Sequence, residues 1–229
     1  MTDKHSSISF SKNNKIANLS KHMFGTNLEH IGDAIYRNGI WAEVIKNRKF
    51  CGPDKLVWNN GLEHDHLDFG IIQPWTGFNA SAKHVMYAHS NSEYITKGEE
   101  VVSRYGSGKQ SQQITIREKS TLNRGVQQKI FLIDPKDEFN FSIVTKGENQ
   151  KIFIEIGEVK FSFFSKKKWH KYTKKIKFKK NNSNKRICIS IKSGNIYIAN
   201  CSLMPQDTIH GFRKDITKMI KEWTPSYIR

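Results

Sequence analysis

The sequence predicts a mainly β protein with some α structure: a jelly-roll β-sandwich inserted into the start of an incomplete (β/α)8 barrel. Between about residues 67 and 204, short runs of alternating apolar and polar residues follow one another, separated by turn signals. Single strand-and-helix patterns lie on either side of this zone, at residues 22–46 and 207–229. Because a whole barrel needs about 250 residues by itself, these flanks account for only its first one and a half units.

The composition excludes several classes of protein. Hydrophobic residues make up 37% and aromatic residues 11% of the 229 positions, which is typical of a folded globular chain. No run approaches the roughly 18 to 20 apolar residues that a membrane-spanning helix needs. The first residues lack the apolar stretch of a secretory signal, and the three widely spaced cysteines, Cys51, Cys188 and Cys201, suit reduced thiols. We therefore expect a cytoplasmic protein without membrane contact.

The first twenty residues predict strands. Residues 8–11 and 15–19 each combine β-branched or apolar side chains with polar ones, and two asparagines at 13–14 form a turn signal between them. Residues 1–20 are therefore assigned to the N-terminal strands of an accessory β-sandwich.

Residues 21–62 predict the first βα unit of the barrel. Residues 22–30 form a compact apolar run that ends in polar side chains, among them Asn27 and Glu29. Residues 32–46 follow with a helix-compatible spacing of apolar side chains, which Asn38 and Gly39 interrupt. A barrel of this type carries its functional side chains at the C-terminal ends of its strands, which is where these two residues would lie.

Residues 63–205 predict the jelly roll. Alternation is clear at 112–117, 128–133, 139–144, 152–163, 172–178, 187–191 and 196–203. Turn signals such as Lys-Gly-Glu-Asn at 146–149 and Lys-Ser-Gly-Asn at 192–195 separate these runs. Carbohydrate-binding sandwiches stack sugar rings on aromatic side chains. Candidates for this role are Trp75, Tyr87, Trp169 and Tyr197, although an aromatic residue in a sandwich more often belongs to the core.

Residues 206–229 predict the second barrel helix and the start of a second strand. Asp207 suits the N-cap, and Pro225 ends the helical pattern. The apolar residues of the pattern lie three and four apart on one stripe: Ile209, Phe212, Ile216, Met219, Ile220 and Trp223.

The net charge of +17 is concentrated in one segment. Residues 160–186 contain twelve Lys or Arg residues and no Asp or Glu, and the rest of the chain carries a net charge of only +5. One interpretation is a polyanion site with interleaved Trp169, Tyr172 and Phe178. The alternative, which the scarcity of Arg favours, is a solvated strand face whose lysines guard a sheet edge. Nucleic acid is therefore not the expected partner.

Two long motifs closely resemble the α-L-arabinofuranosidases of glycoside hydrolase family 51. FGTNLEHIG at 24–32 and GIWAEVIKNRKF at 39–50 match the opening strand and the following conserved pattern of that family. SLMPQDTIHGFRKDITKMIKEWTPSYIR at 202–229 resembles the segment that leads into the family's Arg-aromatic-Pro-Gly-Gly turn. Members with this layout insert a jelly roll, similar to a carbohydrate-binding module, between the two segments.

The resemblance implies three substrate-binding residues and no catalytic ones in this chain. Glu29 would bind hydroxyls of the arabinofuranosyl ring, Asn27 would lie beside it, and Arg229 would correspond to the arginine next to the nucleophile. Retaining hydrolysis needs two carboxyl groups about 5 Å apart, and both glutamates lie later in the family's barrel than residue 229. No metal site or cofactor is expected, because residues two apart in the EHDH cluster at 63–66 share a strand face without completing a site.

Three hypotheses follow. The main one is an N-terminal fragment of an arabinofuranosidase-like retaining glycosidase, inactive alone, which acts on arabinose-containing oligosaccharides or polysaccharides when the remainder of the barrel is supplied. The alternative is a stand-alone carbohydrate-binding β-sandwich without catalysis. A third is a basic face that binds an acidic polysaccharide or nucleic acid. The first predicts an exposed apolar helix stripe, and the third predicts affinity that falls steeply with salt.

Overall fold

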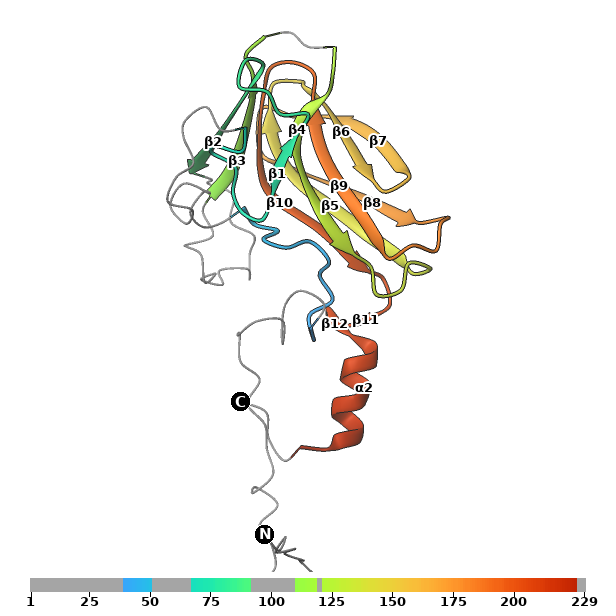
Figure 1. Cartoon of the computed structure of the whole chain (residues 1–229). Coiled ribbons are helices and arrows are strands. Elements are labelled where there is room, and N and C mark those ends of the chain that lie inside the picture. Colours follow the sequence, from blue (N-terminus) through green and yellow to red (C-terminus); the bar gives the residue numbers. More distant parts are fainter. Residues whose placement is uncertain (1–38, 51–66, 92–109, 119–120, 226–229) are drawn as a thin grey trace, which may run out of the picture.

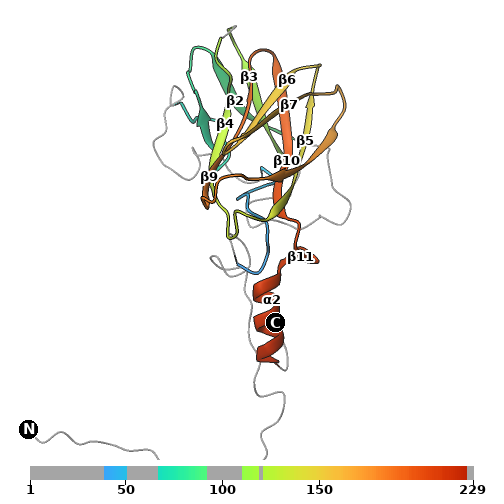
Figure 2. The same ribbon diagram turned by 90° about the vertical axis from the view of Figure 1, so that its right-hand side faces the viewer.

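The computed structural model describes residues 39–50, 67–91, 110–118 and 121–225 (Figure 1). These residues form a mainly β structure with two five-stranded sheets, and the strands within each sheet pair in antiparallel fashion. The two sheets lie face to face, and a short helix projects from one end of the sandwich (Figure 2). The β-sandwich predicted from the alternating runs is confirmed.

The first sheet contains strands that the alternating pattern largely predicts. Its order is β1 (Thr76–Phe78), β4 (Arg124–Phe131), β9 (Asn184–Ile191), β6 (Lys151–Ile156) and β7 (Val159–Phe164). The single run expected at 152–163 is wrong, because the chain reverses between β6 and β7. Gly157 has a φ of 57°, a left-handed conformation that glycine adopts without steric cost.

The second sheet carries the candidate site. Its order is β2 (Val85–Asn91), β3 (Gln110–Ile116), β10 (Asn195–Pro205), β5 (Glu138–Gly147) and β8 (His170–Lys177). β8 is an edge strand and its lysines are exposed, as the sheet-edge interpretation predicts; the same exposure is open to an anionic ligand. The sequence did not predict β2, because Met86 and Ala88 on its outward side are also apolar and obscure the alternation.

The core lies between the two sheets. Inward side chains of both sheets are almost completely shielded from solvent, including Val126, Ile152, Ile154, Ile187, Ile189, Ile114, Phe141, Ile196, Ile198 and Leu203. Phe50 and Trp75, which lie outside the long strands, stack with ring centroids 4.9 Å apart and are fully buried. Burial of each large side chain stabilises the fold by about 1.5–3 kcal/mol.

The helix expected over residues 32–46 is wrong for its described part. None of residues 39–46 is helical, and their backbone groups bond to residues far along the chain. Val44 N–H donates to the carbonyl of Leu203 at 3.1 Å, and Ala42 N–H donates to the carbonyl of Gly211 at 3.0 Å. The spacing of apolar residues fits a helix, but these tertiary hydrogen bonds satisfy the same backbone groups in an extended conformation.

The helix of the last segment begins later than expected. Residues 208–213 form a tight hairpin of β11 (Thr208–Ile209) and β12 (Phe212–Arg213), and α2 spans Lys214–Trp223. His210 and Gly211 both have positive φ, as the two central residues of such a turn require. Asp207 is therefore not the N-cap. Thr224 ends the helix in a left-handed conformation just before Pro225, so the predicted end is confirmed.

α2 extends away from the sandwich, and none of its residues is buried (Figures 1 and 2). Met219 is 63% and Trp223 is 61% exposed, so the expected exposed apolar stripe is confirmed for the helix. No helix in the described part of the chain is long and apolar enough to cross a membrane. The incomplete barrel stays a prediction. Its strands would be parallel, whereas the strand pairs in the described part of the chain are antiparallel.

Candidate functional site

The outer face of the second sheet brings a row of polar and aromatic side chains together. On β10, Tyr197 lies between the buried residues Ile196 and Ile198, so the alternation of the strand directs it outward. Its neighbours in register are Gln113 on β3 and Lys146 on β5. Three adjacent strands thus place an amide, a phenol and an ammonium group side by side.

Trp169 adds a second aromatic ring to this row. It precedes β8 directly, and the next residue, His170, pairs with Thr145 on β5. The ammonium nitrogen of Lys146 lies 5.9 Å from the centroid of the Trp169 ring and 5.8 Å from that of the Tyr197 ring. Both distances fall in the range of cation–π attraction, so the two rings flank one positive charge.

A chain of hydrogen bonds leads to Tyr197 from the neighbouring strand. Gln113 Nε2 donates to Thr115 Oγ1 at 3.2 Å, and Thr115 Oγ1 donates to Asn195 Oδ1 at 3.2 Å. Asn195 Nδ2 then donates to the Tyr197 hydroxyl oxygen at 3.1 Å. Because Tyr197 accepts this bond, its own O–H proton remains available to another acceptor.

We call these six residues the Tyr197 patch: Gln113, Thr115, Lys146, Trp169, Asn195 and Tyr197. All six are half-buried, so they are held in place by their neighbours while part of each side chain faces solvent. The patch offers two aromatic rings, two amide side chains, two hydroxyls and one cation. Such a combination can bind an amphipathic, hydroxyl-rich molecule.

The four aromatic residues predicted for stacking divide between core and surface. Trp75 is fully buried against Phe50. Tyr87 points inward and donates its hydroxyl to the carbonyl of Gly125 at 2.7 Å, and burial raises the pKa of that phenol. Only Trp169 and Tyr197 are in the Tyr197 patch. The other four members were not identified from the sequence, because the register that aligns β3, β10 and β5 is a tertiary property.

The substrate-binding residues implied by the resemblance, Asn27, Glu29 and Arg229, lie outside the described residues. The EHDH cluster at 63–66 also lies there. Within the described ranges, no group of His, Cys, Asp and Glu side chains could hold a metal ion.

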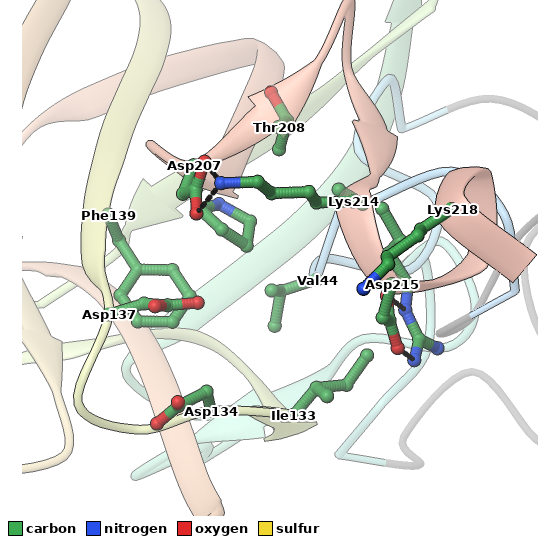
Figure 3. Close-up of a pocket in the computed structure, with 13 residues that line it drawn as sticks. Val44, Ile133, Asp134, Asp137, Phe139, Asp207, Thr208, Lys214, Asp215 and Lys218 are labelled. Carbon is green, nitrogen blue, oxygen red and sulfur yellow. Dashed lines mark hydrogen bonds and ion pairs between the residues drawn. The ribbon is translucent and has the colours of Figure 1, made fainter.

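A second candidate is a cavity of about 420 Å³ between the end of the sandwich and α2 (Figure 3). Val44 and Phe139 form part of its apolar wall, and several charged side chains line the rest. Lys214 Nζ binds both carboxylate oxygens of Asp207 at 2.9 and 3.0 Å, and Arg213 pairs with Asp215. These ion pairs join the hairpin region to the first turn of α2.

One carboxyl group in this cavity has a perturbed pKa. Burial, followed by the nearby carboxylates of Asp134 and Asp207, raises the pKa of Asp137 above its ordinary value. Repulsion among these carboxylates and desolvation both raise the pKa, so a proton binds Asp137 more readily than it binds an isolated aspartate. Among the described residues that line the cavity, Phe139 alone has an aromatic ring, so the cavity suits a carbohydrate less well than the Tyr197 patch does.

Comparisons with protein families and with curated proteins gave no match. Among solved structures, the enzymatically active domain of tailspike protein 4 of bacteriophage CBA120 is 13% identical, with a TM-score of 0.45. The alignment covers 63% of this chain but only 21% of that domain.

Two carbohydrate-binding domains are similar over most of their own length. The CBM22-1 xylan-binding domain of Paenibacillus barcinonensis Xyn10C is 12% identical, with a TM-score of 0.40 over 61% of this chain and 90% of that one. TmCBM61, solved in complex with β-1,4-galactotriose, is 14% identical, with a TM-score of 0.40 over 63% of this chain and 97% of that one. Scores below 0.5 do not decide a ligand or an activity, which we therefore infer from the side chains described above.

Proposed function

We propose that this chain is a carbohydrate-binding β-sandwich whose ligand lies across the Tyr197 patch. The observation that supports the proposal is the pair of half-buried rings, Trp169 and Tyr197, joined to a chain of amide and hydroxyl groups. A sugar ring has an apolar C–H face and a rim of hydroxyl groups. The aromatic rings suit the first and the amide and hydroxyl groups suit the second.

The test is saturable binding to a panel of polysaccharides, both neutral and acidic, with arabinan and arabinoxylan included because the family resemblance implies arabinose. Affinity electrophoresis would identify binders, and isothermal titration would measure Kd. We expect Tyr197→Ala and Trp169→Ala each to weaken binding about tenfold, because a stacked ring contributes on the order of 1.4 kcal/mol.

Phe164→Ala is the matched control, because Phe164 is also an aromatic residue of a strand and is 54% exposed, but it lies on β7 of the first sheet. It should bind as the unsubstituted chain does. Equal losses in all three variants, or binding that is insensitive to Tyr197 and Trp169, would overturn the proposed site. Thermal unfolding of each variant would show whether it remains folded.

A second candidate function is the glycosidase fragment that the sequence motifs imply. The observation that favours it is the exposed stripe of α2, with Met219 and Trp223 uncovered, because further barrel helices would bury such a stripe. In this case the complete enzyme would trim arabinose-containing oligosaccharides in the cytoplasm. Hydrolysis of p-nitrophenyl α-L-arabinofuranoside by the chain, with and without the protein encoded directly downstream, tests this function. Continued inactivity in the mixture would argue against it.

A further inference from the structure

The ammonium group of Lys146 is compensated differently from those of two other lysines of the sandwich, Lys185 and Lys160. Lys185 pairs with Glu158 at 3.0 Å and Lys160 pairs with Glu155 at 3.0 Å. In the part of the chain that the structure describes, no carboxylate pairs with Lys146. Its side chain is half-buried between two aromatic rings, which attract the charge but do not neutralise it.

Further positive charge continues from Lys146 along the same face. Lys171 on β8 is the register partner of Val144, so it lies diagonally from Lys146, at about 7–8 Å between such positions in an antiparallel sheet. Tyr172 and Ile176 point toward the core, so Lys171 and Lys175 point outward, and both are exposed.

Two acidic groups lie near this face, and both pair with other lysines. Glu138, at its far end, pairs with Lys177 at 3.7 Å, and Glu148, two residues after Lys146, pairs with Lys167 at 3.4 Å, so neither offsets the charge of Lys146 and Lys171. The face next to the Tyr197 patch therefore has an uncompensated positive potential, which attracts anionic ligands.

The hydrogen-bond chain of the Tyr197 patch also favours an anionic ligand. It runs from Gln113 to Tyr197, and the Tyr197 hydroxyl group has its proton left to donate. Together with the three protons of the Lys146 ammonium group, this hydroxyl gives the centre of the patch an excess of donors over acceptors. A carboxylate or sulfate offers acceptors only, so it fits this centre better than a neutral hydroxyl does.

We propose that the ligand of the Tyr197 patch is an acidic polysaccharide, with Lys146 binding an anionic group of the sugar stacked on Trp169 and Tyr197. This inference rests on the proposed carbohydrate-binding function and names the class of its ligand. A polysaccharide fits better than a nucleic acid because the amide and hydroxyl chain matches a hydroxyl-rich ligand. No Arg fork, which phosphate recognition usually employs, lies among the six residues of the patch.

The experiment compares four probes by isothermal titration with the full chain: polygalacturonate, its fully methyl-esterified neutral form, dextran sulfate and single-stranded DNA of similar length. We expect polygalacturonate or dextran sulfate to bind at least about tenfold more tightly than the neutral ester, with affinity that falls as salt rises from about 50 to 200 mM. A preference between the first two would identify carboxylate or sulfate as the anionic group.

Lys146→Gln should weaken binding of the preferred acidic polysaccharide about tenfold and leave the neutral ester unaffected. The matched control is Lys129→Gln, which removes the same charge from an exposed position on the outer face of the first sheet. It should change the affinity less than about twofold. Equal effects of the two substitutions would overturn the inference, because they would indicate a general charge effect.

The remaining outcomes separate the two proposals. Equal affinity for the acidic and neutral polymers, lost in Tyr197→Ala, would overturn the acidic ligand and leave the carbohydrate-binding function standing. Tighter binding of DNA than of any polysaccharide, with dependence on Lys146, would overturn the acidic polysaccharide in favour of nucleic acid. Absence of binding to all four probes and to the panel of neutral polysaccharides would overturn both proposals.

Discussion

The carboxylate of Glu43 accepts the backbone N–H of Leu203 at 2.8 Å, across 160 residues of sequence. The same oxygen accepts the N–H of Ile45 at 3.0 Å, and the other oxygen accepts the hydroxyl of Ser202. Glu43 is only 6% exposed. One side chain therefore attaches the segment before the sandwich to β10, the strand that also carries Tyr197.

Replacing Glu43 tests whether its hydrogen bonds or its charge matter for stability. Glu43→Ala leaves the N–H groups of Leu203 and Ile45 without their acceptor, so we expect a loss of about 3 kcal/mol in the free energy of unfolding. Glu43→Gln retains an acceptor and removes the buried charge, so its loss should stay within about 1 kcal/mol. Urea denaturation followed by circular dichroism measures both values. If Gln proves as destabilising as Ala, the ionised carboxylate itself is required.

The pH dependence of stability should change in the same Gln variant. Burial raises the pKa of Glu43. Its hydrogen bonds and the charge of Arg48 lower the pKa, but burial has the larger effect. The folded state therefore binds a proton more readily than the unfolded state, and this contribution to stability falls as the pH rises above the ordinary value of 4.5. Glu43→Gln should remove that decline, which urea midpoints measured between pH 4.5 and pH 7 would detect.

Glu158 should have the opposite pH dependence. Burial raises its pKa, but hydrogen bonds from the backbone, led by Lys180, and from the Lys185 ammonium outweigh that effect and lower the pKa to about 2. Its stabilisation is therefore complete above pH 4.5 and is lost as the pH falls toward 2. Glu158→Gln should cost on the order of 2 kcal/mol at pH 7, because the Lys185 side chain is only 4% exposed.

Glu148→Gln is the control for this ion pair. Glu148 contacts Lys167 at 3.4 Å, and both side chains are more than 75% exposed. Exposed pairs contribute little, so the expected loss is below about 0.5 kcal/mol. A loss equal to that of Glu158→Gln would contradict the assignment of Lys185 as a buried partner.

The two described cysteines should be unreactive in the folded protein. Burial raises the pKa of Cys188 to about 11, and burial followed by the Glu43 charge raises the pKa of Cys201 well above its ordinary value. In a Cys51→Ser variant at pH 8, a thiol reagent such as DTNB should modify neither residue in the native state and both in urea. Rapid modification without denaturant would show that the sandwich opens locally.

Substitutions on the exposed stripe of α2 should leave the sandwich stable. Met219→Glu and Trp223→Glu change side chains that are more than 60% exposed, so the free energy of unfolding should change by less than about 0.5 kcal/mol. Light scattering should show weaker self-association, because the uncovered apolar surface is reduced. Ile189→Ala in the core is the contrasting variant, with an expected loss of about 2–4 kcal/mol. A comparable loss on α2 would mean that the helix packs against the rest of the chain.

The sequence by itself determined most of the strands and the kinds of side chain available for binding. The alternation at 139–144, 187–191 and 196–203 indicates which side chains face the core. Each of these runs lies within an observed strand. The residues implied by the family resemblance remain predictions, because Asn27, Glu29 and Arg229 lie outside the described part of the structure.

Only the tertiary structure decided how these parts combine. It placed Trp75 in the core and Trp169 on a half-buried outer face, kept residues 39–46 out of a helix, and aligned Tyr197 on β10 with Lys146 on the neighbouring strand β5. The physical reason is that local periodicity depends on the burial of one strand's own face. Which strand lies beside it, and in which register, depends on hydrogen bonds and packing between residues far apart in the chain.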